Sequence, residues 1–256
     1  MMRWSGFSLV LAALLFAAVP ASAAKLLVLE SSPDTGLQKG DSVDGSKPLT
    51  VKPDNYVVLM DESGQVVTVR GPYSGVPGGS DKADGPSLLT RMAAIVTTEG
   101  SSGSTTLGLT RGLIKPAKTP TVWSINAGLS GTQCVKPGTA LELWRPSPHE
   151  AVSFSLSRKG TKEHTRFEWP DGETIVPWPK KIAAADGATY VIHFAPPEMT
   201  RELTLRIMPA AVSTDAETLS WMATVGCTVQ AKMLIDQLSD QRVVDGSKAS
   251  GEKLFK

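Results

Sequence analysis

Short apolar and β-branched runs, separated by turns rich in glycine and proline, dominate this chain from about residue 25 onward. Residues 25–30 (KLLVLE) are strand-like, and residues 56–60 (YVVLM) and 66–69 (VVTV) flank the turn Asp61–Gly64. Two such runs around an acidic turn that ends in glycine predict a β-hairpin. Gly71-Pro72 ends the second run, because proline cannot donate to a strand ladder. We therefore expect a small β domain over residues 25–75.

A second series of strand-like runs fills residues 119–211. Turns such as Lys136-Pro137-Gly138 and Pro170-Asp171-Gly172 separate six runs, which are 122–126, 140–144, 152–156, 164–169, 190–194 and 203–207. Strands at this spacing, with turn residues between them, predict a β-sandwich-like domain.

Helical periodicity appears inside a connector at residues 76–118. Five apolar residues share one helical face and predict a short helix there: Leu88, Leu89, Met92, Ile95 and Val96.

The carboxyl-terminal part predicts a helix pair over residues 212–243. Thr214 and Glu217 have the spacing of a capping box, and Gly226 is placed to end the first helix. Residues 244–256 are mostly small and polar, which predicts a disordered tail. The expected fold class is mainly β, with a small β domain, a β-sandwich-like domain and this helix pair.

The amino-terminal residues 1–24 have the composition of a secretory signal peptide. Arg3 precedes the apolar run 7–20, and small residues follow at 21–24. Cleavage is expected near Ala23 or Ala24, with delivery to a bacterial periplasm; a retained amino-terminal anchor is the alternative. No later segment is apolar enough to cross a membrane, so the mature form is expected to have no integral membrane segment.

Charge then excludes two classes of partner. The chain has 26 basic and 25 acidic residues, and removal of the leader takes away only Arg3 among them. A formally neutral mature protein lacks the basic surplus of nucleic-acid-binding proteins and of polybasic membrane-surface modules.

The two cysteines, Cys134 and Cys227, suggest one disulfide bond. An even number of cysteines in an oxidising compartment most often pairs. Two unpaired thiols are the alternative.

Residues 25–75 resemble a FecR-type periplasmic domain. The resemblance is carried by Gly40-Asp41, Pro48-Leu49 and the two apolar strands around Asp61–Gly64. It implies a β-rich interaction or sensing domain without catalysis. FecR regulators have a cytosolic segment and a membrane helix before this domain, whereas here a cleavable leader precedes it, so control of a sigma factor is not implied.

No recognisable catalytic motif is present, so we predict no enzyme activity, cofactor or metal. The histidines His149, His164 and His193 lack the close spacing of metal ligands. Glu168 and Asp171 are the best carboxylate pair for glycan hydrolysis, but a solvated hairpin end explains them more simply.

Four tryptophans lie close together in the second domain. Trp123 and Trp144 lie in apolar runs and are expected in the core, whereas Trp169 and Trp178 flank a turn and are candidate ligand contacts. We expect an exported, non-enzymatic protein that binds another envelope protein. A glycan-binding or glycan-hydrolysing envelope protein is the alternative.

Overall fold

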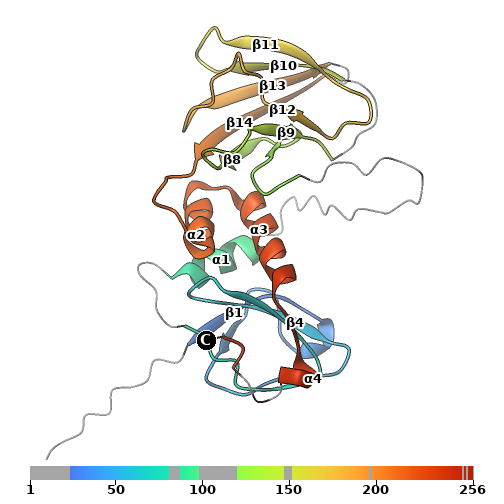
Figure 1. Ribbon diagram of the computed structural model, residues 1–256, viewed down its shortest axis with the longest axis vertical. Coiled ribbons are helices and arrows are strands. Elements are labelled where there is room, and N and C mark those ends of the chain that lie inside the picture. Colours follow the sequence, from blue (N-terminus) through green and yellow to red (C-terminus); the bar gives the residue numbers. More distant parts are fainter. Residues whose placement is uncertain are drawn as a thin grey trace, which may run out of the picture.

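The computed structural model describes residues 24–80, 87–97, 120–146, 152–195, 198–249, 251 and 253–255. Two groups of strands lie at opposite ends of the long axis, and three helices lie between them (Figure 1). The fold is mainly β, as the spacing of the apolar runs predicts. Among the described helices, none combines the length and the apolar character that a membrane span requires.

The amino-terminal domain is built on a five-stranded sheet with the order β15-β5-β4-β1-β2. Neighbouring strands are antiparallel, except that β15 runs parallel to β5. A second sheet pairs β3 with β6. The elements are β1 (Lys25–Ser31), β2 (Ser42–Asp44), β3 (Leu49–Val51), β4 (Tyr56–Asp61), β5 (Val66–Arg70), β6 (Tyr73–Gly75) and β15 (Val243–Asp245), with a 3-10 turn at Pro33–Thr35.

Both faces of this sheet are buried, which explains why its strands are continuous apolar runs. Along β4, Val57 and Leu59 face the core shared with β3, β6 and the end of the chain, whereas Val58 and Met60 face the helices. Thr68 interrupts the apolar pattern of β5, and its hydroxyl donates to the main-chain oxygen of Ser239 in the helix layer (2.9 Å). The β1–β4–β5 sheet is therefore the central layer of the domain.

The predicted β4–β5 hairpin is confirmed, and its turn is held by a buried carboxylate. Asp61 is fully buried and accepts hydrogen bonds from the main-chain N–H groups of Ser63, Gln65 and Ser80. Gly64 has a φ of +77°, and a Cβ at this position would lie 2.6 Å from the Cβ of Ala216. Glycine therefore gives the turn its backbone conformation and lets a helix approach closely.

The three central helices are α1 (Leu88–Thr97), α2 (Asp215–Val225) and α3 (Thr228–Gln241). All five apolar residues of the predicted connector helix are buried in α1. The capping box of Thr214 and Glu217 is present, and Gly226 ends α2 in the left-handed conformation, so these predictions are confirmed. The helices share one core with the inner face of the β1–β4–β5 sheet.

The capping box makes stability depend on pH. Main-chain N–H groups of Ser213 and Thr214, together with the Ser213 hydroxyl, donate to the Glu217 carboxylate and lower its pKa from 4.5 to about 2. A carboxyl group with a lower pKa in the folded state contributes stability above its unfolded pKa and loses it as the pH falls through the folded value. The contribution is therefore complete above pH 4.5 and is lost between pH 4.5 and about 2.

Glu217→Gln tests this dependence. We expect the difference in free energy of unfolding between wild type and variant to be constant from pH 7 to about 5 and to shrink towards pH 2. Urea denaturation over this pH range measures it. A difference that stays the same at every pH would contradict the role of the ionised carboxylate.

The predicted disordered tail is wrong for the described residues after 243. β15 adds to the edge of the amino-terminal sheet, and α4 (Gly246–Ala249) follows it. Leu254 and Phe255 are buried in the core between the two sheets, and their N–H groups donate to the Pro77 oxygen. The tail is polar on average, but this apolar pair fills a core that the amino-terminal strands leave open. The predicted domain boundaries at residues 75 and 243 therefore separate segments that belong to one domain and share one core.

The second domain is a sandwich of unequal sheets. Five strands have the order β11-β10-β13-β14-β8, and three short strands have the order β12-β9-β7. Apolar side chains between the sheets form one core. The elements are β7 (Ile125–Asn126), β8 (Gly131–Val135), β9 (Glu142–Trp144), β10 (Val152–Arg158), β11 (His164–Trp169), β12 (Ile175–Pro177), β13 (Thr189–Ala195) and β14 (Met199–Ile207).

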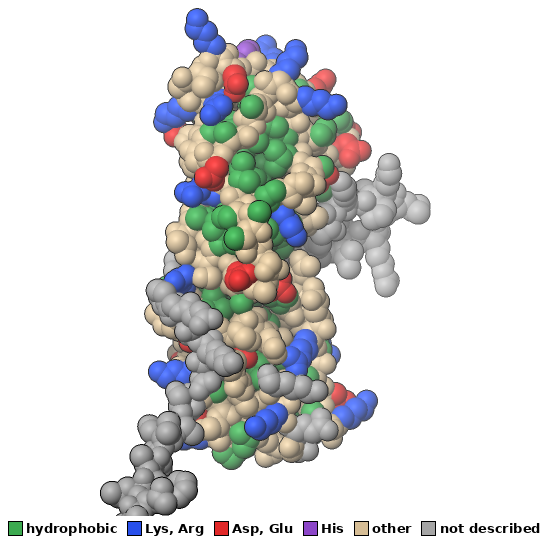
Figure 2. Space-filling model, turned by 60° about the vertical axis from the view of Figure 1, so that its left-hand side comes forward, with side chains coloured by type: hydrophobic (Ala, Val, Ile, Leu, Met, Phe, Trp, Pro, Cys, Tyr) green, Lys and Arg blue, Asp and Glu red, His purple; other side chains and the backbone are tan. Residues whose placement is uncertain are grey.

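Positive and negative side chains are interspersed on the face of the molecule seen in Figure 2. Hydrophobic side chains gather on the upper lobe of this face and continue down its middle. No single sign of charge dominates the view, in keeping with the formal neutrality of the chain without its leader.

Candidate functional site

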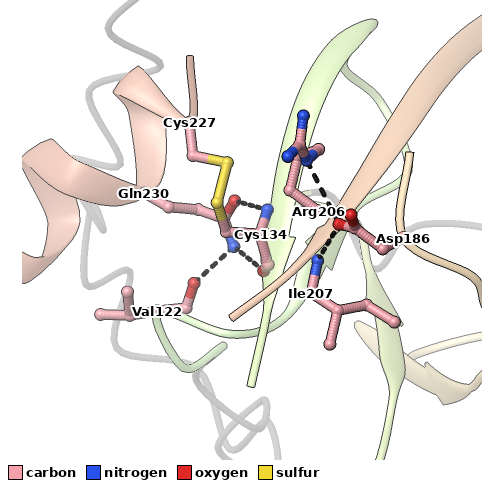
Figure 3. The surroundings of a disulfide bond; sticks show 7 residues. All are labelled: Val122, Cys134, Asp186, Arg206, Ile207, Cys227 and Gln230. Carbon is pink, nitrogen blue, oxygen red and sulfur yellow. Dashed lines mark hydrogen bonds and ion pairs between the residues drawn. A yellow bond between two sulfur atoms is a disulfide. The ribbon is translucent and has the colours of Figure 1, made fainter. Parts of the chain in front are cut away.

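The two domains are joined by a disulfide bond and a buried glutamine (Figure 3). Cys134 of β8 and Cys227, the residue before α3, are bonded, which confirms the predicted pairing. Beside them Gln230 of α3 donates from Nε2 to the main-chain oxygens of Val122 (2.7 Å) and Cys134 (2.6 Å). Its Oε1 accepts from the Cys134 N–H (2.5 Å). The Gln230 side chain thus takes the place of a neighbouring strand at the β8 edge.

A second group of polar contacts lies on the sandwich side of the disulfide bond and involves β14 (Figure 3). The Asp186 carboxylate accepts from the Ile207 N–H (2.8 Å) and from Nε of Arg206 (3.2 Å). β14 lies next to β8 in the sheet, so the contact supports the strand pair that carries Cys134.

A hollow of about 680 Å³ lies at this junction. The sandwich side contributes Trp123 and Lys136, and the helix side contributes Asp215, Thr218 and Gln237 among others. Lys136 Nζ lies 5.9 Å from the centre of the Trp123 ring, within the range of a cation–π contact. The hollow therefore combines an aromatic surface with hydroxyl, amide and charged groups.

Trp123 is half-buried, lines this hollow and packs against the helix core, so its predicted place in the core of the sandwich is wrong. The segment before β7 is a turn and not a strand: the Thr121 N–H donates to Ser124 Oγ (3.0 Å), and the Trp123 N–H donates to Thr121 Oγ1 (3.2 Å). Local hydroxyl-to-backbone bonds of this kind compete with strand pairing. Pro120, Thr121 and Ser124 around the tryptophan are the sequence signal for this turn.

Trp169 and Trp178 are not surface contacts, and this prediction is wrong. Trp169 is 0% exposed and Trp178 is 8% exposed. Both side chains point into the sandwich core, where Trp178 Nε1 donates to the main-chain oxygen of Ile182 (2.7 Å) and its ring meets Tyr190 edge-on. A flanking turn does not decide the direction of a side chain, because neighbouring strand residues face opposite sides of a sheet. Trp144 is buried, as predicted.

The histidines and carboxylates considered in the sequence analysis do not come together at one site in the described residues. His149 lies outside the described residues. His164 is exposed on β11, and His193 contacts Thr200 and Glu198 on the neighbouring strand and turn. Glu168 and Asp171 are both exposed. Within the described ranges, no group of three His, Cys, Asp or Glu side chains is arranged to hold a metal ion.

A cluster of titratable side chains lies where α3 meets β1 and β4. The Tyr56 hydroxyl donates to Glu30, and this hydrogen bond is the main reason for the raised pKa of Tyr56. Asp236 nearby is exposed by its accessible surface, but the surrounding protein partly desolvates its carboxylate and raises its pKa; Lys39 opposes the shift, and Glu30 adds to it. These residues do not line the junction hollow, so the cluster is separate from the candidate site.

Comparison of the chain with protein-family models, with curated proteins and with solved structures finds no match. The FecR-like character of residues 25–75 therefore stays a prediction.

Proposed function

We propose that this protein is exported to the bacterial envelope and acts there as a non-enzymatic binding protein for another protein. The leader-like residues 1–24 support export, and the Cys134–Cys227 bond is compatible with an oxidising compartment. The resemblance of residues 25–75 to FecR-type domains implies a periplasmic location and an interaction or sensing role without catalysis.

The half-buried Trp123 in the junction hollow is the observation that carries the proposal. Tryptophan is among the residues that contribute most to protein–protein binding, and it does so best in a hollow that excludes water. Lys136 and Asp215 bring opposite charges to the same hollow and can orient a partner.

A photo-crosslinking amino acid at Gln237, an exposed residue that lines the hollow, tests this binding site in intact cells. We expect one defined protein adduct in the envelope fraction, and Trp123→Ala is expected to reduce its yield by about tenfold or more. Trp221→Ala is the matched control, because Trp221 is half-buried on α2 and does not line the hollow.

The same photo-crosslinking amino acid at Thr50, an exposed residue of β3, is the control for nonspecific crosslinking. Equal adducts from both positions, or a Gln237 adduct that Trp123→Ala leaves unchanged, would contradict the proposed site. Recovery of the unprocessed chain from the cytosol would contradict export.

Saccharide binding is a second candidate, favoured because Trp123 lines the same hollow as Ser213, which has a hydroxyl group, and Gln237, which has an amide group. An aromatic ring next to hydrogen-bonding groups suits a sugar ring as well as a side chain. Trp123-dependent retention of the purified protein on insoluble cell wall, without a protein adduct in cells, would favour this candidate.

A further inference from the structure

The outer edge of β11 is unpaired within the described part of the chain. β11 is the last strand of its sheet, and it lies at the far end of the long axis, away from the helices and the amino-terminal domain (Figure 1). An open strand edge presents main-chain N–H and C=O groups to any chain that can align with it. Proteins commonly cover such an edge, and here no described strand pairs with it.

The register of the β10–β11 hairpin shows which groups face outward. The Arg158 N–H donates to the Glu163 oxygen (3.1 Å), so this pair is hydrogen-bonded. Hydrogen-bonded pairs recur at every second residue of an antiparallel ladder. Thr165, Phe167 and Trp169 therefore bond to β10, and the main-chain groups of His164, Arg166 and Glu168 point away from the sheet.

The side chains along this edge can pair with those of a second, antiparallel copy of the same strand. Arg166 and Glu168 are exposed on the polar face of the strand, and the half-buried Phe167 lies between them on the opposite face against Phe154. If a second β11 aligns antiparallel with the two-fold axis at Phe167, each Arg166 lies opposite Glu168 of the other copy. The outward main-chain groups of these residues then meet as hydrogen-bonded pairs, and the two Phe167 side chains meet on the apolar face.

Neighbouring alignments are less favourable. A two-fold axis at Arg166 would place two arginines opposite each other, and one at Glu168 would place two glutamates opposite each other. Like charges in directly opposed positions destabilise a strand pair. Pro170 follows β11 directly and cannot donate to a ladder, which limits how far the pairing can extend.

We propose that β11 is a self-association surface, and that two copies of this chain join their five-stranded sheets through antiparallel β11 strands centred on Phe167. We assign a second copy of the chain to this edge because two antiparallel β11 strands place Arg166 of each copy opposite Glu168 of the other. The surface is separate from the junction hollow, so the proposed function and this inference succeed or fail independently.

Charge reversal tests the pairing. Sedimentation equilibrium of the purified protein over a wide concentration range is expected to show a monomer–dimer equilibrium. Arg166→Glu or Glu168→Arg alone opposes like charges twice across the axis and is expected to weaken dimerisation by about tenfold or more. The double variant R166E/E168R restores opposite charges and is expected to return the dissociation constant to within about threefold of wild type. Both residues are exposed, so the variants are expected to fold.

Cysteine crosslinking provides a second readout. The chain has two cysteines and both are bonded to each other, so a cysteine introduced into β11 is the single free thiol. Phe167→Cys places two thiols at the axis and is expected to yield a crosslinked dimer on mild oxidation. Thr165→Cys, whose counterpart is Trp169 of the second copy, is the control and is expected to yield little.

A wild-type protein that stays monomeric at every concentration overturns the proposal. So does a dimer that the single charge reversals leave unchanged, a double variant that fails to recover, or crosslinking at position 165 as efficient as at position 167. A strand of a different protein at this edge would show no recovery in the double variant, and it is thereby distinguished from a second copy.

Discussion

Replacing Cys134 and Cys227 together with alanine is expected to lower the free energy of unfolding by about 4–5 kcal/mol. The two cysteines are 93 residues apart, and the loop that they close contains the strands β9 to β14 and helix α2. In the chain-entropy model, a crosslink across a loop of this length restricts the unfolded chain strongly, and its removal returns that freedom. The effect is larger than that of most single substitutions.

The folded structure is expected to change little in this double variant. Gln230 still bonds to Val122 and to both main-chain groups of Cys134, and these contacts join β8 to α3 without the sulfur atoms. Denaturant titration with and without reductant measures the loss. Reductant is expected to destabilise the wild type by a similar amount and to leave the double variant unaffected. A difference below about 1 kcal/mol between oxidised and reduced wild type would contradict this account.

Features set by nearby residues could be predicted from the sequence. The β4–β5 hairpin depends on the buried runs around Asp61–Gly64, and α1 depends on one apolar face. The capping box of α2 depends on residues three positions apart. In each case the residues that determine the element are also the residues that contact each other.

Features that depend on which distant strands and helices pack together could not be predicted, whereas the Cys134–Cys227 pair could, because the chain has two cysteines. β8 begins with Gly131 and Thr132 and has little apolar pattern; it forms a strand because β14 lies parallel to it and because Gln230 covers its other edge. The directions of Trp169 and Trp178 depend in the same way on the strands that pack over them. The junction hollow combines Trp123 with residues of α2 and α3 about 90–110 positions away, and no local pattern indicates that meeting.

In the described residues, the helix layer lies between the two strand groups and packs against both. α1, α2 and α3 pack on the amino-terminal sheet, and the same apolar core includes Val122 and Cys134 from the start of the sandwich. A partner in the junction hollow would contact both the sandwich and the helices at once. Binding there is expected to depend on Gln230, whose hydrogen bonds hold these walls together with or without the disulfide bond.

Phe255→Ala is expected to lower the free energy of unfolding by about 3–5 kcal/mol, although it lies at the end of a tail that the sequence predicts to be disordered. The ring is 1% exposed and fills the core between the β1–β4–β5 sheet and the β3–β6 pair. Its removal leaves a cavity among side chains that cannot all move to fill it. Leu254 next to it is also buried and is expected to behave similarly.

Lys253→Ala is the matched control for this substitution, because Lys253 is exposed and lies in the same segment. Its expected effect is within about 0.5 kcal/mol. Urea denaturation of both variants measures the difference, and hydrogen exchange locates it in β4, β5 and β15. If Phe255→Ala is as stable as Lys253→Ala, the tail does not belong to the core. A loss confined to Phe255→Ala means that the Phe255 side chain is part of the core of the amino-terminal domain, about 180 residues or more after the strands β1 to β6 that surround it.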